Sequence, residues 1–186
     1  GNMSINLVFI VVLLFSLFFT SITSSSISLE GKSINITKSL PVMISTIFNS
    51  KLLMAITIEM PFVISSLLII SIKFKLSFVY FILVLLFSLL IVLCNGMTGL
   101  IVNLKYPKLN YSSDTEVVKQ SMSSMISVFI GLLFFVGITF CLFKLIDVIS
   151  LNLLILIIIV GLGIICTGLY YFLNKFGIKD YEKLSV

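Results

Sequence analysis

The chain has 186 residues, of which 60% are hydrophobic and 10% are charged. Because charged residues make up about 25% of a typical soluble domain, this composition excludes an ordinary soluble protein and predicts an all-α, polytopic integral membrane bundle. The formal net charge of +5 comes from lysine alone, and the chain contains neither arginine nor histidine. The lack of histidine excludes His-based catalysis and most transition-metal sites. We therefore predict no enzyme and no metal or cofactor bound by this chain.

Five segments with few or no charged residues are long enough to cross a hydrocarbon core ~30 Å thick, which needs roughly 20 apolar residues per helix. We expect the second helix to kink or loosen near Pro61 and the third to loosen at Asn95-Gly96 and Gly99. Together the helices form one transmembrane domain over residues 1–186. The predicted spans are about 5–24, 52–72, 76–98, 122–143 and 151–172.

Polar residues gather in two loops, about 25–51 and 99–121, and in the tail 174–186. If these share one side of the membrane, that side holds nine lysines and the other side three, which predicts cytoplasmic loops and a cytoplasmic C-terminus. The lysines flank apolar segments, so we interpret them as setting topology in a lipid membrane and predict no nucleic-acid partner. Five spans then put the N-terminus outside, and we expect the chain to be a fragment of a longer protein.

The first loop combines charges with a turn. A Ser-Leu-Pro sequence follows its charged residues and precedes a short apolar-faced run that leads to Lys51. A membrane protein with such a loop offers a surface to a cytosolic partner, so we predict a docking loop for a transport permease. In the second loop, Thr115 to Gln120 is predicted to open a helix capped by Asp114. The predicted docking residues are Glu30, Gly31, Lys32, Lys38, Ser39, Leu40 and Pro41.

Glu59 is the only acidic residue inside a predicted span. A carboxylate within the membrane costs a few kcal/mol and is a functional candidate by default, for example in proton coupling or substrate contact. The competing interpretation is that it faces a watery vestibule or bonds to backbone freed by Pro61. No second intramembrane acid or base completes a relay, which argues against a proton-driven carrier.

Small residues and cysteines also occur inside the spans. Gly161, Gly163 and Gly168, with Thr167, provide small-residue faces, for which ordinary helix packing is the favoured interpretation. The cysteines are odd in number, widely spaced and embedded in apolar segments, so we interpret them as packing residues and expect neither a disulfide framework nor a metal cluster. They are Cys94, Cys141 and Cys166.

Two polar motifs resemble those of a known family. The first runs from Ser26 to Lys32 (SISLEGK) and continues at Lys38 to Val42 (KSLPV). The second begins at Asn95-Gly96, continues at Gly99 to Asn110 (GLIVNLKYPKLN), and ends at Glu116 to Ser121 (EVVKQS). In this order and on one predicted side, they resemble permease subunits of bacterial ATP-binding cassette (ABC) transporters of the type-2, exporter-like kind. The resemblance covers most of the chain and aligns it with the later part of a larger permease.

The resemblance implies that a separate cytosolic ABC ATPase binds the short cytoplasmic helices of the permease, and that ATP is used by that partner. It also implies a second permease copy or half. The docking role would fall on Glu30 to Val42, with the charged residues making polar contacts and Leu40 and Pro41 shaping the turn. The chain departs from the family at Ser33 to Ile36 and at Tyr111, where aromatic residues and tryptophan respectively are frequent.

Two other classes of function remain open. An ion-gradient-driven carrier or channel that uses Glu59 predicts activity that is indifferent to ATP. A non-transporting membrane scaffold or immunity-type protein predicts a partner but no flux.

Overall fold

The computed structural model describes residues 2–20 and 22–184, except for the side chains of residues 2–5, 32 and 119. Within that part of the chain all regular structure is helical, and five helices are long and apolar enough to cross a membrane. The predicted fold class is therefore confirmed. The five helices are α1 (Asn2–Phe19), α3 (Ile44–Phe74), α4 (Phe78–Lys105), α6 (Met122–Leu145) and α7 (Leu151–Phe172).

Short helices fill the polar connections. Two 3-10 helices and α2 link α1 to α3, and α5 precedes α6. A π-helical turn continues α7 directly into α8. Their bounds are η1 (Ile22–Ser25), η2 (Ser28–Ser33), α2 (Ile34–Ser39), α5 (Asp114–Gln120), η3 (Leu173–Gly177) and α8 (Ile178–Lys183).

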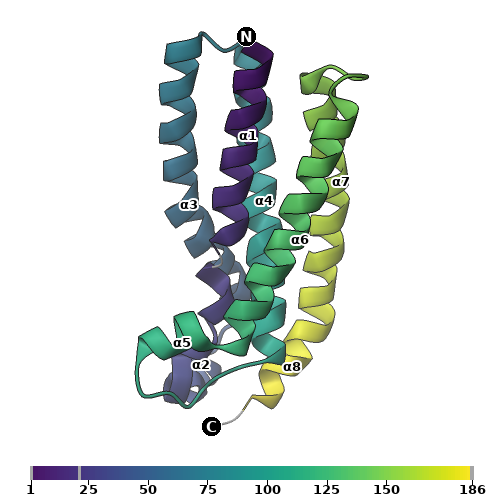
Figure 1. Cartoon of the computed structure of the whole chain (residues 1–186). Coiled ribbons are helices and arrows are strands. Elements are labelled where there is room, and N and C mark those ends of the chain that lie inside the picture. Colours follow the sequence, from purple (N-terminus) through teal and green to yellow (C-terminus); the bar gives the residue numbers. More distant parts are fainter. Residues whose placement is uncertain (1, 21, 185–186) are drawn as a thin grey trace.

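Helix α4 is the centre of the bundle, because it contacts each of the other four long helices. Figure 1 shows α1 and α6 on one side of α4, with α3 and α7 on either flank. The short helices α2, α5 and α8 gather at one end, hereafter the polar end. The short turns after α3 and α6 lie at the opposite end. The two predicted loops and the tail thus share one end of the bundle, as expected.

Helix boundaries differ from the prediction where polar residues interrupt or extend the apolar segments. Helix α1 ends at Phe19, not at Ser24, because the Ser/Thr-rich stretch that follows turns inward as η1. Helix α3 already begins at Ile44, so the last part of the predicted loop 25–51 is helical. The predicted tail is mostly α-helical or π-helical up to Lys183.

The chain stays helical at two places where the sequence predicted a kinked or loosened helix. Pro61 lies inside α3, which remains one helix from Ile44 to Phe74. Asn95-Gly96 and Gly99 lie inside an uninterrupted α4. These three residues are buried in α4. Asn95 forms hydrogen bonds there, and Gly96 leaves room for Leu52 to approach.

Helices α1 and α6 approach each other at Gly131. A Cβ atom added there would lie 2.4 Å from the backbone oxygen of Phe18, so glycine is what permits the close contact. Nearby, the rings of Phe18 and Phe134 stack with their centroids 5.9 Å apart. The contact fixes α6 against the end of α1.

We predict that Gly131→Ala destabilises the bundle, because the new methyl group collides with rigid backbone. Overpacking of this kind costs about 1–3 kcal/mol. Gly137→Ala on the same helix is the matched control, since no atom lies within 4 Å of the Cβ position there. Thermal unfolding of the detergent-purified variants measures the difference. Equal unfolding temperatures for the two variants would refute the close α1–α6 contact.

Candidate functional site

The site begins where α1 stops. The last carbonyl groups of a helix lack intrahelical partners, and here Asn95 of α4 supplies donors: its Nδ2 lies 2.9 Å from the oxygen of Leu17 and 2.6 Å from that of Thr20. Thr23 Oγ1 then donates to the oxygen of Gly96 at 2.8 Å. These bonds let the chain leave helical geometry inside the protein, where non-helical backbone must find partners.

Asn103 holds the following segment. Its Oδ1 accepts from the backbone nitrogens of Ile27 at 2.8 Å and Ser28 at 3.0 Å. Its Nδ2 donates to Ser28 Oγ at 2.7 Å and to Ser123 Oγ at 3.0 Å. The side chain is completely buried. One amide thus joins the end of α4, the start of η2 and the start of α6.

The two polar loops meet at Gly31. Gly31 has φ +49°, which favours glycine, and a Cβ atom there would lie 3.0 Å from the ring of Tyr111. The Tyr111 hydroxyl donates to the oxygen of Leu29 at 2.9 Å. Tyr111 of the second loop therefore packs on Gly31 and binds Leu29 of the first loop.

Glu30 points back into the protein. Its Oε1 pairs with Lys51 Nζ at 2.6 Å, and the Tyr181 hydroxyl donates to its Oε2 at 3.3 Å. Lys51 also donates to the oxygen of Ser26 at 2.8 Å. Tyr181 is fully buried and meets the ring of Phe48 edge-on at 5.8 Å. This cluster ties η2 to the first turns of α3 and to α8.

Lys38 likewise has partners within the chain. Its Nζ donates to the backbone oxygen of Glu182 at 2.9 Å and to that of Leu184. It also lies 5.5 Å from the centre of the Tyr181 ring. The charged groups of Glu30 and Lys38 therefore bind other parts of the same chain and hold the loop in place. The side chain of Lys32 lies outside the described residues.

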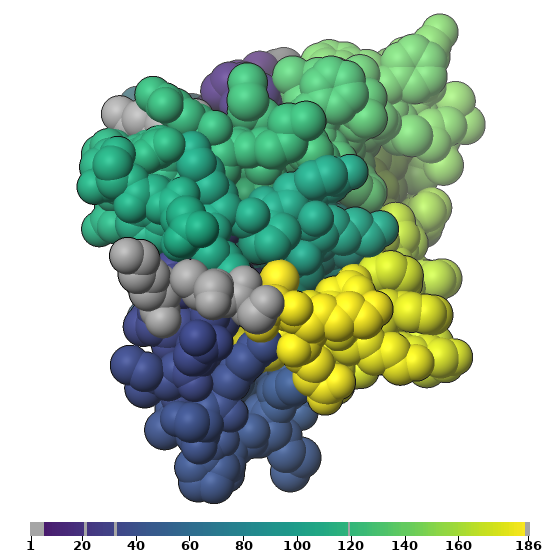
Figure 2. Space-filling view, turned by 90° about the horizontal axis from the view of Figure 1, so that it is seen from below, coloured from purple at the N-terminus to yellow at the C-terminus, as the bar shows by residue number. Residues whose placement is uncertain are grey.

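The end of α2 and the turn after it expose apolar side chains at the polar end. Ile36 is 67% exposed, Leu40 52% and Met43 77%, and Val42 is also exposed. Ser39 and Pro41 are exposed between them. Figure 2 shows the 36–43 segment and the start of α3 in blue on this end, beside the yellow C-terminal part of the chain. We call Ile36, Leu40, Val42 and Met43 the α2 tip.

The second loop is fixed by an ion pair. Lys108 Nζ lies 2.6 Å from Glu116 Oε1, and Glu116 Oε2 accepts from the backbone nitrogen and hydroxyl of Ser112 at 3.1 and 3.0 Å. Helix α5 forms where it was predicted. Asp114 is its first residue, however, and the preceding Ser113 occupies the cap position without a side-chain cap bond. The predicted cap is thus one residue too late.

Glu59 is buried beside α1. It lines a pocket of about 340 Å³ between α1 and α3, together with apolar residues and Ser16, Thr20 and Ser66. Thr20 Oγ1 donates to the backbone oxygens of Ser16 at 3.1 Å and Leu17 at 3.2 Å. Glu59 Oε2 has no hydrogen-bond partner among the described residues. The interpretation that Glu59 bonds to backbone freed by Pro61 finds no supporting contact in this part of the chain.

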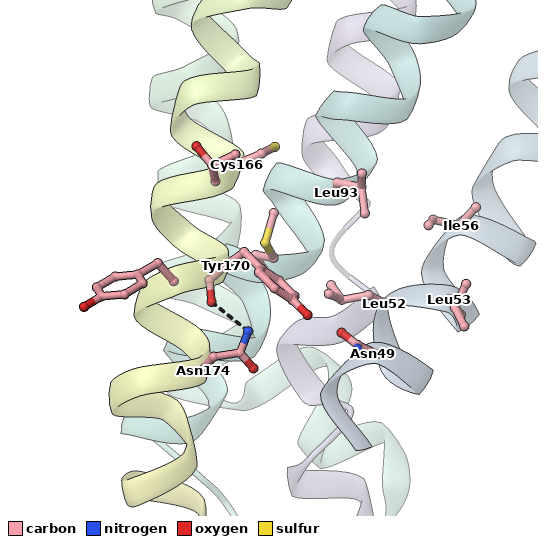
Figure 3. Close-up of a pocket in the computed structure, with 11 residues that line it drawn as sticks. Asn49, Leu52, Leu53, Ile56, Leu93, Cys166, Tyr170 and Asn174 are labelled. Atoms are coloured by element: carbon pink, nitrogen blue, oxygen red, sulfur yellow. Dashed lines mark hydrogen bonds between the residues drawn. The ribbon is translucent and has the colours of Figure 1, made fainter. Parts of the chain in front are cut away.

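A larger groove of about 700 Å³ lies over the outer face of α4. Figure 3 shows α3 on one side of it, with Asn49, Leu52 and Ile56, and α7 on the other, with Cys166 and Tyr170. Asn174, at the polar end of the groove, donates to the oxygen of Tyr170 at 3.1 Å. The groove is mainly apolar along its length, so it suits an apolar or amphipathic occupant.

The structure also places the glycines of α7 and the cysteines. No atom lies within 4 Å of a Cβ position at Gly161, Gly163 or Gly168, so the described residues show no close helix packing at these glycines. Cys94 and Cys166 lie side by side between α4 and α7, a contact that the sequence did not predict. Residues so far apart in sequence carry no local signal of their contact. Among the described residues, no group of three or more metal-ligating side chains forms a metal site.

Comparison of the chain with protein-family models, with curated proteins and with solved structures gave no significant match.

We predict that Asn103→Ala loosens the polar end, because the backbone nitrogens of Ile27 and Ser28 lose their common acceptor. A buried unsatisfied group costs about 1–3 kcal/mol. The variant should unfold at a lower temperature and be cleaved faster by protease within residues 27–33. Asn152→Ala, an exposed asparagine at the opposite end, is the control and should match the unchanged protein. If Asn103→Ala resists protease as well as the unchanged protein does, the Asn103 side chain does not hold η2 against α4.

Proposed function

We propose that this chain is a membrane-spanning permease component of an ABC transporter, moving an unidentified substrate across the cytoplasmic membrane with ATP hydrolysed by a separate cytosolic subunit. The observation that carries the proposal is the α2 tip. The tip is a cluster of exposed apolar side chains at the polar end, and exposed apolar patches mark interaction sites. The KSLPV motif, which resembles that of ABC-2 permeases, includes Leu40 and Val42 of the tip, and the EGK motif lies in η2, just before α2.

The tip is mechanically connected to the groove. The Glu30–Lys51 pair and Tyr181–Phe48 contact attach η2 and α8 to α3. The Lys38 bonds attach α2 to the segment that continues α7. Because α3 and α7 are the two sides of the groove, a push on the α2 tip would be passed to both. This is the coupling that alternating access requires, in which ATPase contacts differ between two states.

This mechanism assigns the docking residues two roles. Leu40, Pro41 and Ser39 would contact the ATPase, while Glu30, Gly31 and Lys38 would hold the tip in shape. Leu40 and Met43 would enter a surface groove of the partner protein and bury apolar surface there. Such central anchor residues carry most of the binding energy of an interface.

The test is affinity purification of the full-length native protein from its own membranes in mild detergent, followed by mass spectrometry. We expect a stoichiometric ABC ATPase to copurify, and to be lost in the double variant Leu40→Ser/Met43→Ser. The matched control is Ile72→Ser/Val148→Ser, which removes two apolar side chains at the opposite end that are at least as exposed and should retain the ATPase.

Three results would contradict the proposal. The first is purification without any ABC ATPase under conditions that preserve known permease complexes. The second is an ATPase retained by the α2-tip variant, and the third is an ATPase lost equally from both double variants. Circular dichroism and unfolding temperature of each variant separate lost binding from lost folding, because neither pair of substitutions removes a buried side chain.

A second candidate function is an ion-gradient-driven carrier, favoured by Oε2 of Glu59, which has no hydrogen-bond partner among the described residues that surround its pocket. A carboxyl group that exchanges a proton or cation there would drive flux without ATP. The two candidates make opposite predictions for the isolated chain.

Under the permease proposal, the purified chain in proteoliposomes shows no proton or sodium flux above that of empty vesicles, and Glu59→Gln changes nothing. Under the carrier alternative, an imposed gradient drives ion flux that Glu59→Gln abolishes, because the amide cannot exchange a proton. Fluorescent pH and sodium indicators inside the vesicles measure this. Gradient-driven flux that depends on Glu59 would replace the permease proposal with the carrier.

A further inference from the structure

Cys94 of α4 and Cys166 of α7 form a close thiol pair. Their Sγ atoms lie 2.7 Å apart, although the residues are 72 positions apart in sequence. The exposed fractions of the two residues are 2% and 8%. A disulfide bond is ~2.05 Å long, so each sulfur would need to move only a few tenths of an ångström to form one.

The surroundings leave each thiol few other partners. Cys94 Sγ lies 3.8 Å from the oxygen of Leu162, and Cys166 Sγ lies 3.5 Å from that of Leu90. Both are weak contacts across the same helix pair, so the thiols are each other's nearest polar neighbours. The third cysteine, Cys141 on α6, is exposed and belongs to a different pocket.

Access to the pair is through the apolar groove. Cys166 is one of the residues that line the groove, and Figure 3 shows it on the α7 side, opposite Leu93 and Ile56. The part of the groove beside Cys166 lies between α3, α4 and α7, which are long and apolar enough to cross a membrane, so a molecule that reaches Cys166 along this part comes from the hydrocarbon region. An apolar, membrane-soluble oxidant is therefore suited to reach the pair, and a charged, water-soluble one is not.

We propose that Cys94 and Cys166 are a reversible dithiol–disulfide site whose oxidant is a membrane-soluble quinone. The two S–H bonds break and one S–S bond forms. The two electrons and two protons pass to the quinone, which becomes the quinol. A dithiol reductant reverses the step by thiol–disulfide exchange. The proposal is independent of the function proposed above.

Oxidation joins the base of the groove to one of its sides. Helix α4 forms the base and α7 one side, and a covalent link between them holds that side in a single position. A motion that widens the groove by moving α7 away from α4 at the level of the two cysteines is then blocked. The site thus makes the groove geometry sensitive to the redox state of the membrane.

The experiment counts free thiols in the full chain in lipid nanodiscs. The reduced protein is exposed to a fully substituted short-chain quinone, which oxidises thiols without adding to them, or to ferricyanide, which is charged. After denaturation, maleimide–polyethylene glycol labels every remaining thiol, and mass spectrometry identifies the linked peptides. The unchanged protein should fall from three labels to one on quinone treatment, return to three with dithiothreitol, and react more slowly with ferricyanide.

Variants that each lack one of the three cysteines show which thiols react. Cys141→Ser should fall from two labels to none, whereas Cys94→Ser and Cys166→Ser should each keep two. The proposal is overturned if the folded protein keeps all three labels while the same quinone oxidises the denatured chain. It is also overturned if Cys141 supplies a partner, or if ferricyanide reacts as fast as the quinone, which would exclude the apolar route.

Discussion

The structure depends on one constraint: backbone that leaves helical geometry beside a membrane must find all its hydrogen-bond partners within the protein. The chain meets this constraint with one face of α4. Asn95 and Asn103, about two helical turns apart, bind the carbonyl groups at the end of α1 and the nitrogens at the start of η2. Gly96 lets Leu52 and Thr23 approach the same face. The chain can therefore turn within the bundle and deliver η2 and α2 to the polar end.

Once the segment is fixed there, its charges connect elements that are distant in sequence. Glu30 pairs with Lys51, and Lys38 binds backbone near the C-terminus. Partly buried pairs of this kind contribute more to defining one geometry than to net stability. The surface that they leave outside includes the exposed apolar side chains of Ile36, Leu40 and Met43. In the proposed permease, a tip held from inside and apolar on its surface is suited to transmit force from a partner to α3 and α7.

The sequence alone was sufficient for the architecture and much less so for the site. The five long helices follow from runs of apolar residues that only a membrane can accommodate. Those same runs are apolar on every side, so no periodicity identifies which face is buried, and the contact of Cys94 with Cys166 left no trace. Glu30 pairs with Lys51 of α3 and with Tyr181 of α8, and Lys38 binds the backbone of Glu182 and Leu184, all of which lie beyond the reach of a local sequence pattern. The end of α1 could have been predicted from the sequence. The Ser/Thr-rich stretch after Phe19 indicates a break in the helix, and Asn95 and Asn103 in the mainly apolar segment that forms α4 indicate where its backbone groups find hydrogen-bond partners.

The most direct test of the central claim is photochemical crosslinking in living cells that express the full native protein, with a benzophenone amino acid in place of Leu40. The account predicts a covalent adduct with an ABC ATPase, identified by mass spectrometry, and no such adduct when the probe replaces Val148 at the opposite end. Adducts at position 40 that contain only lipid, or only a second copy of this chain, would contradict it.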